Sequence, residues 1–309
     1  MTHLFIVNPA AGSRDRTEDY RRQIKKTFDE KGGNYRIAVS EGPGDIARIA
    51  NSAARTGEEY RIYACGGDGT LNEVVQGVAG YDNVAVTVFS GGSGNDFVKI
   101  FDDPRAFFDL DRLLDAQEAA FDLIRCNDCF SLNICSVGLG ARIAADVSCY
   151  KRLPLLHGFR AYAAATVINL FKGISEHYAV ELDGQVFDSR FTFVCVCNGR
   201  FYGGGFNPVP EADPADGLLD VLLVDKVSLL QVPKAIGKYK NGRYKELPHL
   251  VKHFKTREIT VRCDREVPVN LDGEAHQAQN IHMTVAKEKL RFFYPRGLTF
   301  QAKLPEKVK

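Results

Sequence analysis

Three glycine-bearing turns hold the residue types that could bind a phosphorylated ligand. They read NPAAG (8–12), GGDGT (66–70) and SGGSGND (90–96), and each follows a short apolar run. Glycines permit positive φ angles and let a bulky anion approach backbone N–H groups, and a helix that begins behind the turn adds a favourable dipole. One such turn would be weak evidence, because every sheet needs turns. Three turns at one sheet edge favour a nucleotide-binding cleft over plain connections.

Two carboxylates lie within these turns, Asp68 in the second and Asp96 at the end of the third. In a phosphate-binding cleft they would repel the ligand unless a cation such as Mg²⁺ lay between them. This combination is typical of phosphoryl transfer, in which positioning and charge neutralisation supply most of the catalysis. Taken singly, each aspartate could equally form an Asx-turn or a helix cap.

Two other nucleotide-binding patterns are poorly matched. The chain has no G-x-x-x-x-G-K-[ST], which excludes the P-loop arrangement. The segment GLGARI (138–143) begins like a dinucleotide fingerprint, but Ile143 occupies the third glycine position. A dehydrogenase is therefore only weakly indicated.

The elements that must position the turns alternate over the first part of the chain. Strands are expected at 3–8, 34–40, 60–66 and 84–92, and helices at 16–32, 45–55 and 70–79, the second of them capped by Asp45. This alternation predicts a parallel sheet covered by helices. The three turns then follow the first, third and fourth strands, at the edge where open α/β sheets bind ligands.

From about residue 128 the pattern changes to strand-like segments, several of them separated by Asp-Gly or Asn-Gly turns. The segments are FSLNICSVG, YAVELDG, FTFVCVCNG, LLDVLLVD, EITVRC, VPVNLDG and IHMTVAKEKLRFFYP. One helical piece at 157–173 interrupts them. We therefore expect an α/β nucleotide domain followed by an all-β domain.

The bulk composition sets limits on partners and location. The chain has 309 residues and a formal net charge of +1, so nothing predicts binding to nucleic acid. Its start, MTHLFIVNPAAG, lacks the basic region of a signal peptide, and no charge-free stretch approaches the ~20 residues of a membrane span. We expect the eight cysteines to be reduced thiols in a cytoplasm. The lone pair Cys126 and Cys129 indicates small buried residues rather than a zinc or redox site.

The order and spacing of NPAAG, GGDGTLNEVV and SGGSGND resemble the catalytic domain of the diacylglycerol kinase family, with bacterial soluble lipid kinases as the nearest members. The resemblance continues through PEADPADGLLDVLLV (210–224) and VNLDGE (269–274), and so covers nearly the whole chain. The turn GGDGT alone is shared with NAD kinases and echoes phosphofructokinases. The following TLNEVV, the N-P-x-x-G start and the late L-D-G-E make the resemblance specific.

The resemblance implies a fold and a domain division. It implies a Rossmann-like three-layer α/β domain that binds ATP over residues 1–126. A β-sandwich domain over 127–292 would carry the general base and a lipid-facing helix, and the segment 293–309 could pack back on the first domain.

The resemblance also implies residue roles. The residues that would bind ATP are Asn8, Pro9, Ala10, Ala11, Gly12, Ser40, Gly66, Gly67, Asp68, Gly69, Thr70, Leu71, Asn72 and Ser93. Ser93 stands where the family usually has threonine, and its hydroxyl is kept. Asp68, acting catalytically, would hold Mg²⁺ with Asp96 through water.

Glu274 matches the general base that takes the proton from the acceptor hydroxyl, which would place that hydroxyl between the domains. Without the resemblance, Glu274 is simply the first exposed residue after an Asp-Gly hairpin turn. Asp213, Asp216 and the backbone carbonyl of Leu218 match a structural Mg²⁺ site of related enzymes. A solvated loop is the alternative for these three residues.

The activity implied by the resemblance is transfer of the γ-phosphoryl group of ATP to a lipid hydroxyl, with diacylglycerol giving phosphatidic acid. The alternatives are a soluble-substrate kinase such as an NAD kinase and a non-catalytic nucleotide-binding protein. Peripheral membrane contact is expected at KRLPLLHGF (151–159), beside Lys151, Arg152 and Arg160, unless this stretch is a loop tucked under the next helix. Related enzymes can form homodimers, and no motif encodes which lipid is the acceptor.

Overall fold

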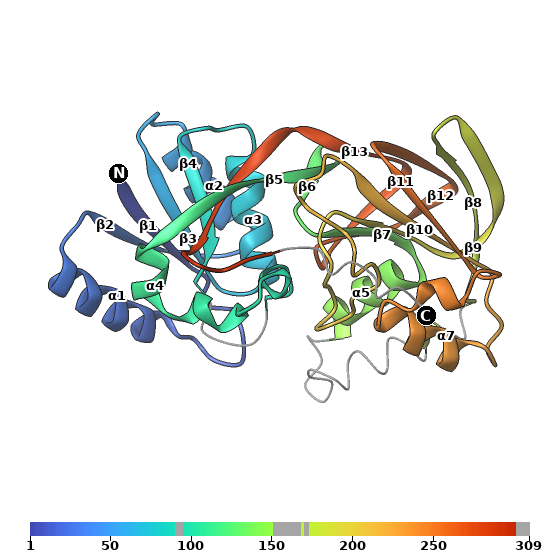
Figure 1. Ribbon diagram of the computed structural model, residues 1–309, viewed down its shortest axis with the longest axis horizontal. Helices are drawn as coiled ribbons and strands as arrows, with labels where there is room; N and C mark the ends of the chain where they lie inside the picture. The colour runs from blue at the N-terminus through green and yellow to red at the C-terminus, as the bar shows by residue number, and fades with distance from the viewer. Residues whose placement is uncertain (90–94, 151–167, 170–172, 301–309) are drawn as a thin grey trace. The chain divides into compact units, whose positions relative to one another are not determined.

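The computed structural model describes residues 1–89, 95–150, 168–169 and 173–300 (Figure 1). The chain forms two compact units: the first comprises Met1–Leu123 and the stretch that begins at Ala286, and the second comprises Ile124–Val285. The strands β5 (Ala116–Cys126) and β13 (Glu274–Pro295) run across both boundaries. The C-terminal return to the first unit therefore begins at Ala286. Ser93, the segment KRLPLLHGF with Arg160, and most of the helix expected at 157–173 lie outside the described residues.

A parallel sheet forms the centre of the first unit. Its strands are β1 (Thr2–Val7), β2 (Tyr35–Val39), β3 (Tyr60–Cys65) and β4 (Val84–Val88), in the order β2-β1-β3-β4. The inner strands are buried on both faces, which explains why they read as continuous apolar runs. Phe292 of β13 pairs with Val86 and extends this sheet.

Helices cover both faces of this sheet and complete the predicted three layers. α1 (Thr17–Lys31) lies on one face, and α2 (Asp45–Ala54) and α3 (Asp68–Val78) lie on the other (Figure 1). Short helical segments follow β4, namely η1 (Phe97–Ile100), η2 (Pro104–Phe108) and α4 (Leu110–Leu114). The cap assigned to Asp45 is wrong by one position, because Gly44 with φ +80° is the N-cap residue and Asp45 begins the helix.

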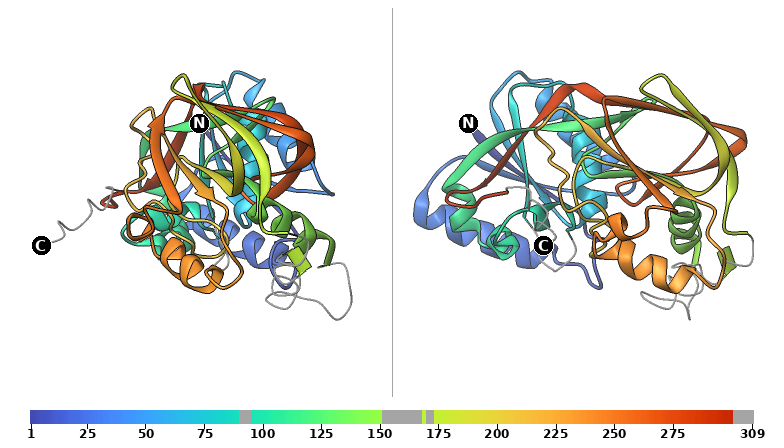
Figure 2. Two further views of the ribbon diagram at one scale, coloured as in Figure 1. Left: turned by 90° about the vertical axis from the view of Figure 1, so that its right-hand side faces the viewer. Right: turned by 45° about the vertical axis from the view of Figure 1, so that its right-hand side comes forward.

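The second unit is built from antiparallel strands, as the resemblance implies for a β-sandwich (Figure 2). Besides β6 (Cys129–Ser131), β7 (Ile134–Gly138) and β8 (Glu176–Leu182), it contains β9 (Gln185–Cys197), β10 (Leu219–Asp225), β11 (Val251–Thr256) and β12 (Glu258–Leu271). The long strands β9 and β12 each pair with β8 along one part of their length and with β7 along another. This exchange of partners wraps the strands around one apolar core that includes Val137, Val196 and Ile281.

Several elements of the second unit differ from the predicted ones. The segments EITVRC and VPVNL form one strand, β12, with an irregularity between Arg262 and Val267. α5 (Leu139–Tyr150), α7 (Val232–Lys240), η3 (Tyr244–Glu246) and β11 were not predicted. In the part of the chain that the structure describes, no helix is long and apolar enough to span a bilayer.

The two weak motifs have structural explanations. Gly138 of GLGARI has φ +103°, and a Cβ there would lie 2.7 Å from the carbonyl oxygen of Thr192. The glycine therefore permits close approach of β7 to β9. Cys126 and Cys129 lie opposite each other in the β5–β6 hairpin as free thiols.

Candidate active site

The carboxyl ends of β1 and β3 bring the first two glycine-bearing turns together. Val7 lies opposite Cys65 in the sheet, so Asn8 and Gly66 leave the two strands side by side. Asn8 N–H donates to the Cys65 carbonyl at 3.1 Å, and its side-chain Nδ2 donates to Thr70 Oγ1 at 3.1 Å. The chain leaves β1 for a helix on one face of the sheet and β3 for a helix on the other. This reversal is the switch point at which open α/β sheets bind ligands.

The turn NPAAG is shaped by its asparagine. Asn8 Oδ1 accepts a hydrogen bond from Ala10 N–H at 3.0 Å, and the Asn8 carbonyl accepts one from Ala11 N–H at 3.1 Å. Gly12 has φ +85°, in the left-handed region that glycine enters without strain. Pro9 is half-buried and Ala10 and Gly12 are exposed, so a ligand can reach this turn.

The turn GGDGT leads directly into α3, which begins at Asp68 rather than at residue 70. Gly66 is required here, because a Cβ at this position would lie 2.1 Å from Thr70 Oγ1. Thr70, Leu71 and Asn72 are buried, so their side chains position the helix. The first turn of α3 leaves backbone N–H groups without intrahelical acceptors, and such groups bind anions.

A hydrogen bond joins the second turn to the third. Asp68 Oδ1 accepts from the backbone N–H of Asp96 at 2.7 Å. Asp96 is buried and its carboxylate pairs with Lys99, three residues later. The hydrogen bond brings the Asp68 carboxylate to the backbone of Asp96, and carboxylate oxygens are ligands that Mg²⁺ prefers. The donor atoms are of the type that Mg²⁺ binds, and the ammonium group of Lys99, which sequence analysis missed, pairs with one of the two carboxylates.

Asn95 is a further candidate that sequence analysis did not single out. Its side chain is 3% exposed, and Oδ1 accepts from Val98 N–H at 3.3 Å. Its Nδ2 is buried without a hydrogen-bond partner among the described residues. A buried donor left unpaired costs about 1–3 kcal/mol, which a ligand oxygen would recover. In the sequence, its position between Gly94 of the third turn and Asp96 could have pointed to a role at the site.

Ser40 lies at the same sheet edge, directly after β2. Its N–H donates to the Val7 carbonyl at 2.9 Å, and its side chain is buried. The structure thus places the ends of β1, β2 and β3 in one row at the switch point, and Asn8, Ser40 and Gly66 directly follow them.

Glu274 lies in the second unit, after the two-residue turn that joins β12 to β13. Asp272 and Gly273 form this turn with φ +52° and +102°, and Leu271 lies opposite Glu274. These angles are those of a hairpin turn that favours Asp-Gly. The Glu274 side chain is exposed and has no hydrogen bond or ion pair to another described residue. Its carboxylate is therefore open to solvent.

Asp272 anchors this hairpin, a role that sequence analysis missed. Its Oδ1 accepts from Ser131 Oγ at 2.6 Å and from the N–H groups of Asn133 and Ile134 at 3.0 and 2.9 Å. Its Oδ2 accepts from Leu132 N–H at 2.8 Å. One carboxylate thus satisfies three consecutive backbone donors, which fixes the base of the turn that carries Glu274.

Replacing Asp272 by asparagine is expected to lower the free energy of unfolding by about 2 kcal/mol, because an amide nitrogen would face a backbone donor. Asparagine keeps the positive φ angle of the turn. Chemical denaturation measures the change. The control is Asp183→Asn in the corresponding Asp-Gly turn between β8 and β9, where the carboxylate accepts, among the described residues, only from Thr256 Oγ1. Equal losses at both positions would contradict the anchoring role.

The loop expected to hold a structural Mg²⁺ has its carboxylates engaged within the chain. Asp213 Oδ1 accepts from Ala215 N–H at 3.0 Å, and Asp216 Oδ1 accepts from Leu218 N–H at 3.0 Å. Asp216 Oδ2 lies 2.8 Å from Lys255 Nζ. No group of three or more acidic, histidine or cysteine side chains is arranged for a metal ion anywhere in the described residues. A cation at Asp216 would therefore compete with the ammonium group of Lys255.

Lys255 also neutralises a buried carboxylate next to this loop. Its Nζ lies 3.3 Å from Oδ2 of Asp220, which is 1% exposed and whose Oδ1 lies 2.6 Å from His253 Nε2. Burial lowers the pKa of Lys255, but the hydrogen bond to Asp216 and the charge of Asp220 outweigh it and leave the pKa raised. The ammonium group is thus a permanent internal cation for the loop.

Replacing Lys255 by methionine is expected to lower the free energy of unfolding by about 1–2 kcal/mol, because it leaves a buried carboxylate without its cation. Added Mg²⁺ should then raise the melting temperature of the variant more than that of the parent. Thermal unfolding with Mg²⁺ and with a chelator measures both effects. Lys252→Met, which removes an exposed 2.9 Å pair with Asp225, is the control. A variant that melts like this control would contradict the role of Lys255.

Two family models together match nearly the whole chain. Residues 2–126 match the diacylglycerol kinase catalytic domain, and residues 133–294 match the YegS C-terminal NAD kinase beta sandwich-like domain. The chain is also similar to a protein named "Putative lipid kinase SERP0390" from Staphylococcus epidermidis, with 25% identity over 276 residues, covering 87% of this chain and 89% of that protein. A "Putative lipid kinase" from Staphylococcus aureus strain JH9 is 26% identical over 243 residues, covering 77% and 79%.

Solved structures share the fold. A crystal structure described as a putative diacylglycerol kinase from Bacillus anthracis str. Sterne has a TM-score of 0.71 at 22% identity, covering 96% of this chain and 97% of that chain. A second structure from the same organism, described as a diacylglycerol kinase, has a TM-score of 0.66 at 20% identity, with the same coverage. At these identities the likeness shows the fold, and it supports the division into an α/β unit and a β-sandwich.

Proposed function

Because this chain belongs to the diacylglycerol kinase family, with a catalytic domain joined to a YegS-type β-sandwich domain, we propose that it is an ATP- and Mg²⁺-dependent lipid kinase. It would transfer the γ-phosphoryl group of ATP to a lipid hydroxyl, with diacylglycerol as the acceptor and phosphatidic acid as the product. The observation that carries this proposal is that hydrogen bonds join the three turns at one switch point. The bond from Asn8 to Thr70 joins the first turn to the second, and the bond from Asp96 to Asp68 joins the third turn to the second.

The first unit supplies the nucleotide site in this proposal. Backbone N–H groups of the turn NPAAG and of the first turn of α3 would donate to the phosphates, as helix N-termini do for anions. Asn95 Nδ2, which is buried without a hydrogen-bond partner among the described residues, would donate to a ligand oxygen. Mg²⁺, when bound, would neutralise charge on the phosphates, and Asp68 with Asp96 would hold it.

The reaction itself is an in-line displacement at the γ-phosphorus. The acceptor oxygen forms a bond to this phosphorus, and the bond from the phosphorus to the oxygen that bridges it to the β-phosphate breaks. ADP leaves with the electron pair of that bond. The hydroxyl proton passes to the carboxylate of Glu274, whose side chain is exposed and unpaired with other described residues. Positioning and charge neutralisation carry most of the rate, as in other phosphoryl transfers.

Transfer of label from γ-labelled ATP tests the proposal directly. The purified chain, with diacylglycerol dispersed in detergent, should form labelled phosphatidic acid with Mg²⁺ and none with a chelator in excess. Ceramide, a sphingoid base, undecaprenol and phosphatidylglycerol serve as alternative acceptors. No label in any of these lipids would contradict a lipid kinase, and ADP release that requires NAD instead would favour a soluble-substrate kinase.

A further inference from the structure

We propose that the turn between β10 and α7 docks on an anionic lipid bilayer. The docking patch consists of Leu229 and Leu230 at the tip of the turn, flanked by Lys226 and Lys234. This inference rests on the proposed function in one respect: a kinase whose acceptor is a lipid must reach a bilayer. It deepens that function by naming the surface that makes the contact. It assigns the membrane contact to a part of the chain that sequence analysis did not associate with lipid.

The two leucines are held outside the core by an ordered turn. Leu230 is 95% exposed and Leu229 is 57% exposed, and they are the only adjacent pair of large exposed apolar side chains among the described residues. Ser228 accepts at its carbonyl from Gln231 N–H at 2.9 Å, and its own N–H donates to Gln231 Oε1 at 3.1 Å. These bonds close a turn whose two central residues are the leucines. The hydrogen bonds between Ser228 and Gln231 thus hold the two leucines in an exposed position.

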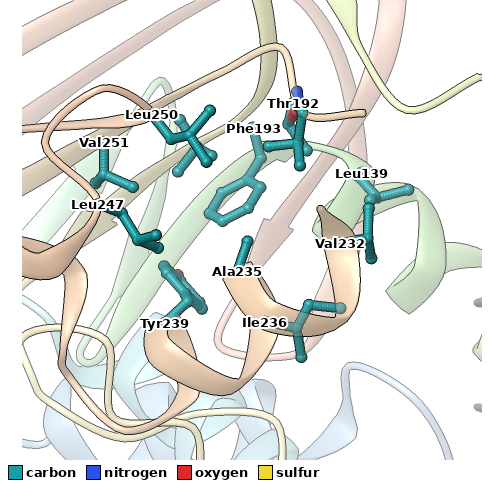
Figure 3. Close-up of a pocket in the computed structure, with 12 residues that line it drawn as sticks. Leu139, Thr192, Phe193, Val232, Ala235, Ile236, Tyr239, Leu247, Leu250 and Val251 are labelled. Atoms are coloured by element: carbon teal, nitrogen blue, oxygen red, sulfur yellow. Dashed lines mark hydrogen bonds between the residues drawn. The ribbon is translucent and has the colours of Figure 1, made fainter. Parts of the chain in front are cut away.

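The apolar face of α7 is already in use, so it offers no place for the leucines. Figure 3 shows Val232, Ala235 and Tyr239 facing residues of other elements. Together with Ile236, which is 41% exposed, they line a small cavity of about 50 Å³. The facing residues are Leu139, Phe193, Leu247, Leu250 and Val251. Since these side chains seat the helix on the second unit, the preceding leucines remain unpartnered on the outside. An exposed apolar pair next to a filled core face is typical of an interaction site.

Charge identifies the partner. Residues 226–245 contain six lysines and arginines and no acidic residue. Lys238 and Arg243 pair with Glu246, and Lys245 pairs with Glu211. The remaining ones, Lys226, Lys234 and Lys240, are exposed and have no ion pair with a described residue. Of these, Lys226 and Lys234 are near the leucines in sequence, and Lys240 ends α7. An apolar tip flanked by Lys226 and Lys234 complements a bilayer whose surface is anionic and whose interior is apolar.

The geometry of the turn suits insertion at the level of the headgroups. Lys226 precedes the leucines by a few residues, and Lys234 lies in the first turn of α7. The leucines would enter the boundary between headgroups and acyl chains, while the lysine ammonium groups stay with the phosphates. Neither the leucines nor the lysines belong to the ATP site or to the hairpin of Glu274.

Vesicle co-sedimentation with the full chain tests the proposal. Vesicles of phosphatidylcholine mixed with phosphatidylglycerol should bind the parent protein, and vesicles of phosphatidylcholine alone should bind it much less. The double variants L229E/L230E and K226E/K234E should each bind the anionic vesicles about tenfold more weakly or worse. Raised salt should weaken binding of the parent, because it screens the lysines.

Two matched variants control for general effects of the substitutions. Val186→Glu changes an apolar side chain that is 62% exposed in another hairpin of the same unit, and Arg257→Glu reverses an exposed charge there. Both should bind anionic vesicles like the parent. Equal binding by L229E/L230E and the parent would overturn the proposal, as would equal losses in the controls. Sedimentation velocity adds a further test: a dimer of the parent that L229E/L230E dissociates, with vesicle binding unchanged, would assign the patch to a second copy instead.

The kinase assay separates this proposal from the proposed function. With diacylglycerol in detergent micelles, L229E/L230E should keep the transfer rate of the parent, while with diacylglycerol in anionic vesicles it should lose about tenfold. A chain that binds vesicles through this patch but phosphorylates no lipid would contradict only the lipid-kinase proposal. Full activity of L229E/L230E on vesicles would contradict only the docking proposal.

Discussion

Asp68→Asn will reduce phosphoryl transfer by about 10³-fold or more while leaving the fold intact. The carboxylate of Asp68 is the negative charge placed at the N-terminus of α3, where the second and third turns meet. In the proposed mechanism it holds Mg²⁺, and a metal ion contributes several kcal/mol of charge stabilisation to the transition state. Each 1.36 kcal/mol corresponds to a factor of ten in rate, which yields the expected loss. Steady-state kinetics with labelled ATP measures it.

Asparagine is the informative substitution because it separates charge from structure. The amide oxygen can still accept the Asp96 N–H bond that Asp68 Oδ1 accepts at 2.7 Å. The melting temperature should therefore stay close to that of the parent. Asp45→Asn is the matched control, since Asp45 is also the first residue of a helix and its carboxylate also accepts a backbone N–H, from Glu41 at 2.9 Å. An Asp68→Asn protein with the activity of this control would overturn the proposed site.

Glu274→Gln is expected to lower kcat by about 10²–10⁴-fold, the range over which general acid–base groups contribute. Glutamine keeps the size of the side chain and its exposed position after the Asp-Gly turn, but it cannot take the proton of the acceptor hydroxyl. Because Glu274 lies outside the turns that carry the nucleotide site, ATP affinity should be unchanged. Kinetics with saturating ATP, together with calorimetric titration of ATP, measures the two quantities separately.

The same variant addresses the non-catalytic alternative. A nucleotide-binding protein without transferase activity would show no difference between Glu274→Gln and the parent in any assay. Glu258→Gln, at the exposed start of β12, is the control for replacing an exposed glutamate in the same unit. Unchanged transfer in Glu274→Gln would remove this residue from the mechanism, and a parallel loss of ATP affinity would indicate a role in nucleotide binding.

The inner strands of the first unit could be predicted closely because they are buried on both faces. Their apolar runs are continuous and end at glycines or polar residues, so the observed bounds differ from the expected ones by few residues, except where β4 ends at Val88. The second unit was harder, because its long strands change partners along their length. α7 also escaped prediction, since Pro233 and Gly237 interrupt its sequence while Val232 and Tyr239 provide its buried face.

The candidate site shows the same division between local and long-range information. The amino-acid sequence by itself determined which turns are rich in glycine and which of them carry Asp68 and Asp96, because a glycine requirement and a turn carboxylate act within a few residues. It also marked Glu274, through its motif. It did not indicate the role of Asp272, whose carboxylate accepts hydrogen bonds from residues about 140 positions away in the chain.

The tertiary structure decided which of these residues meet. The strand order β2-β1-β3-β4 puts the turns after β1 and β3 at one switch point, and the bond from Asp96 N–H to Asp68 adds the third turn. It also decided that Lys255 faces Asp216 and that Leu229 and Leu230 lie outside the core. The physical reason is that strand pairing and burial depend on partners distant in the chain. Patterns of neighbouring residues indicate which secondary structure or turn a segment can form, but not which distant residues it will contact.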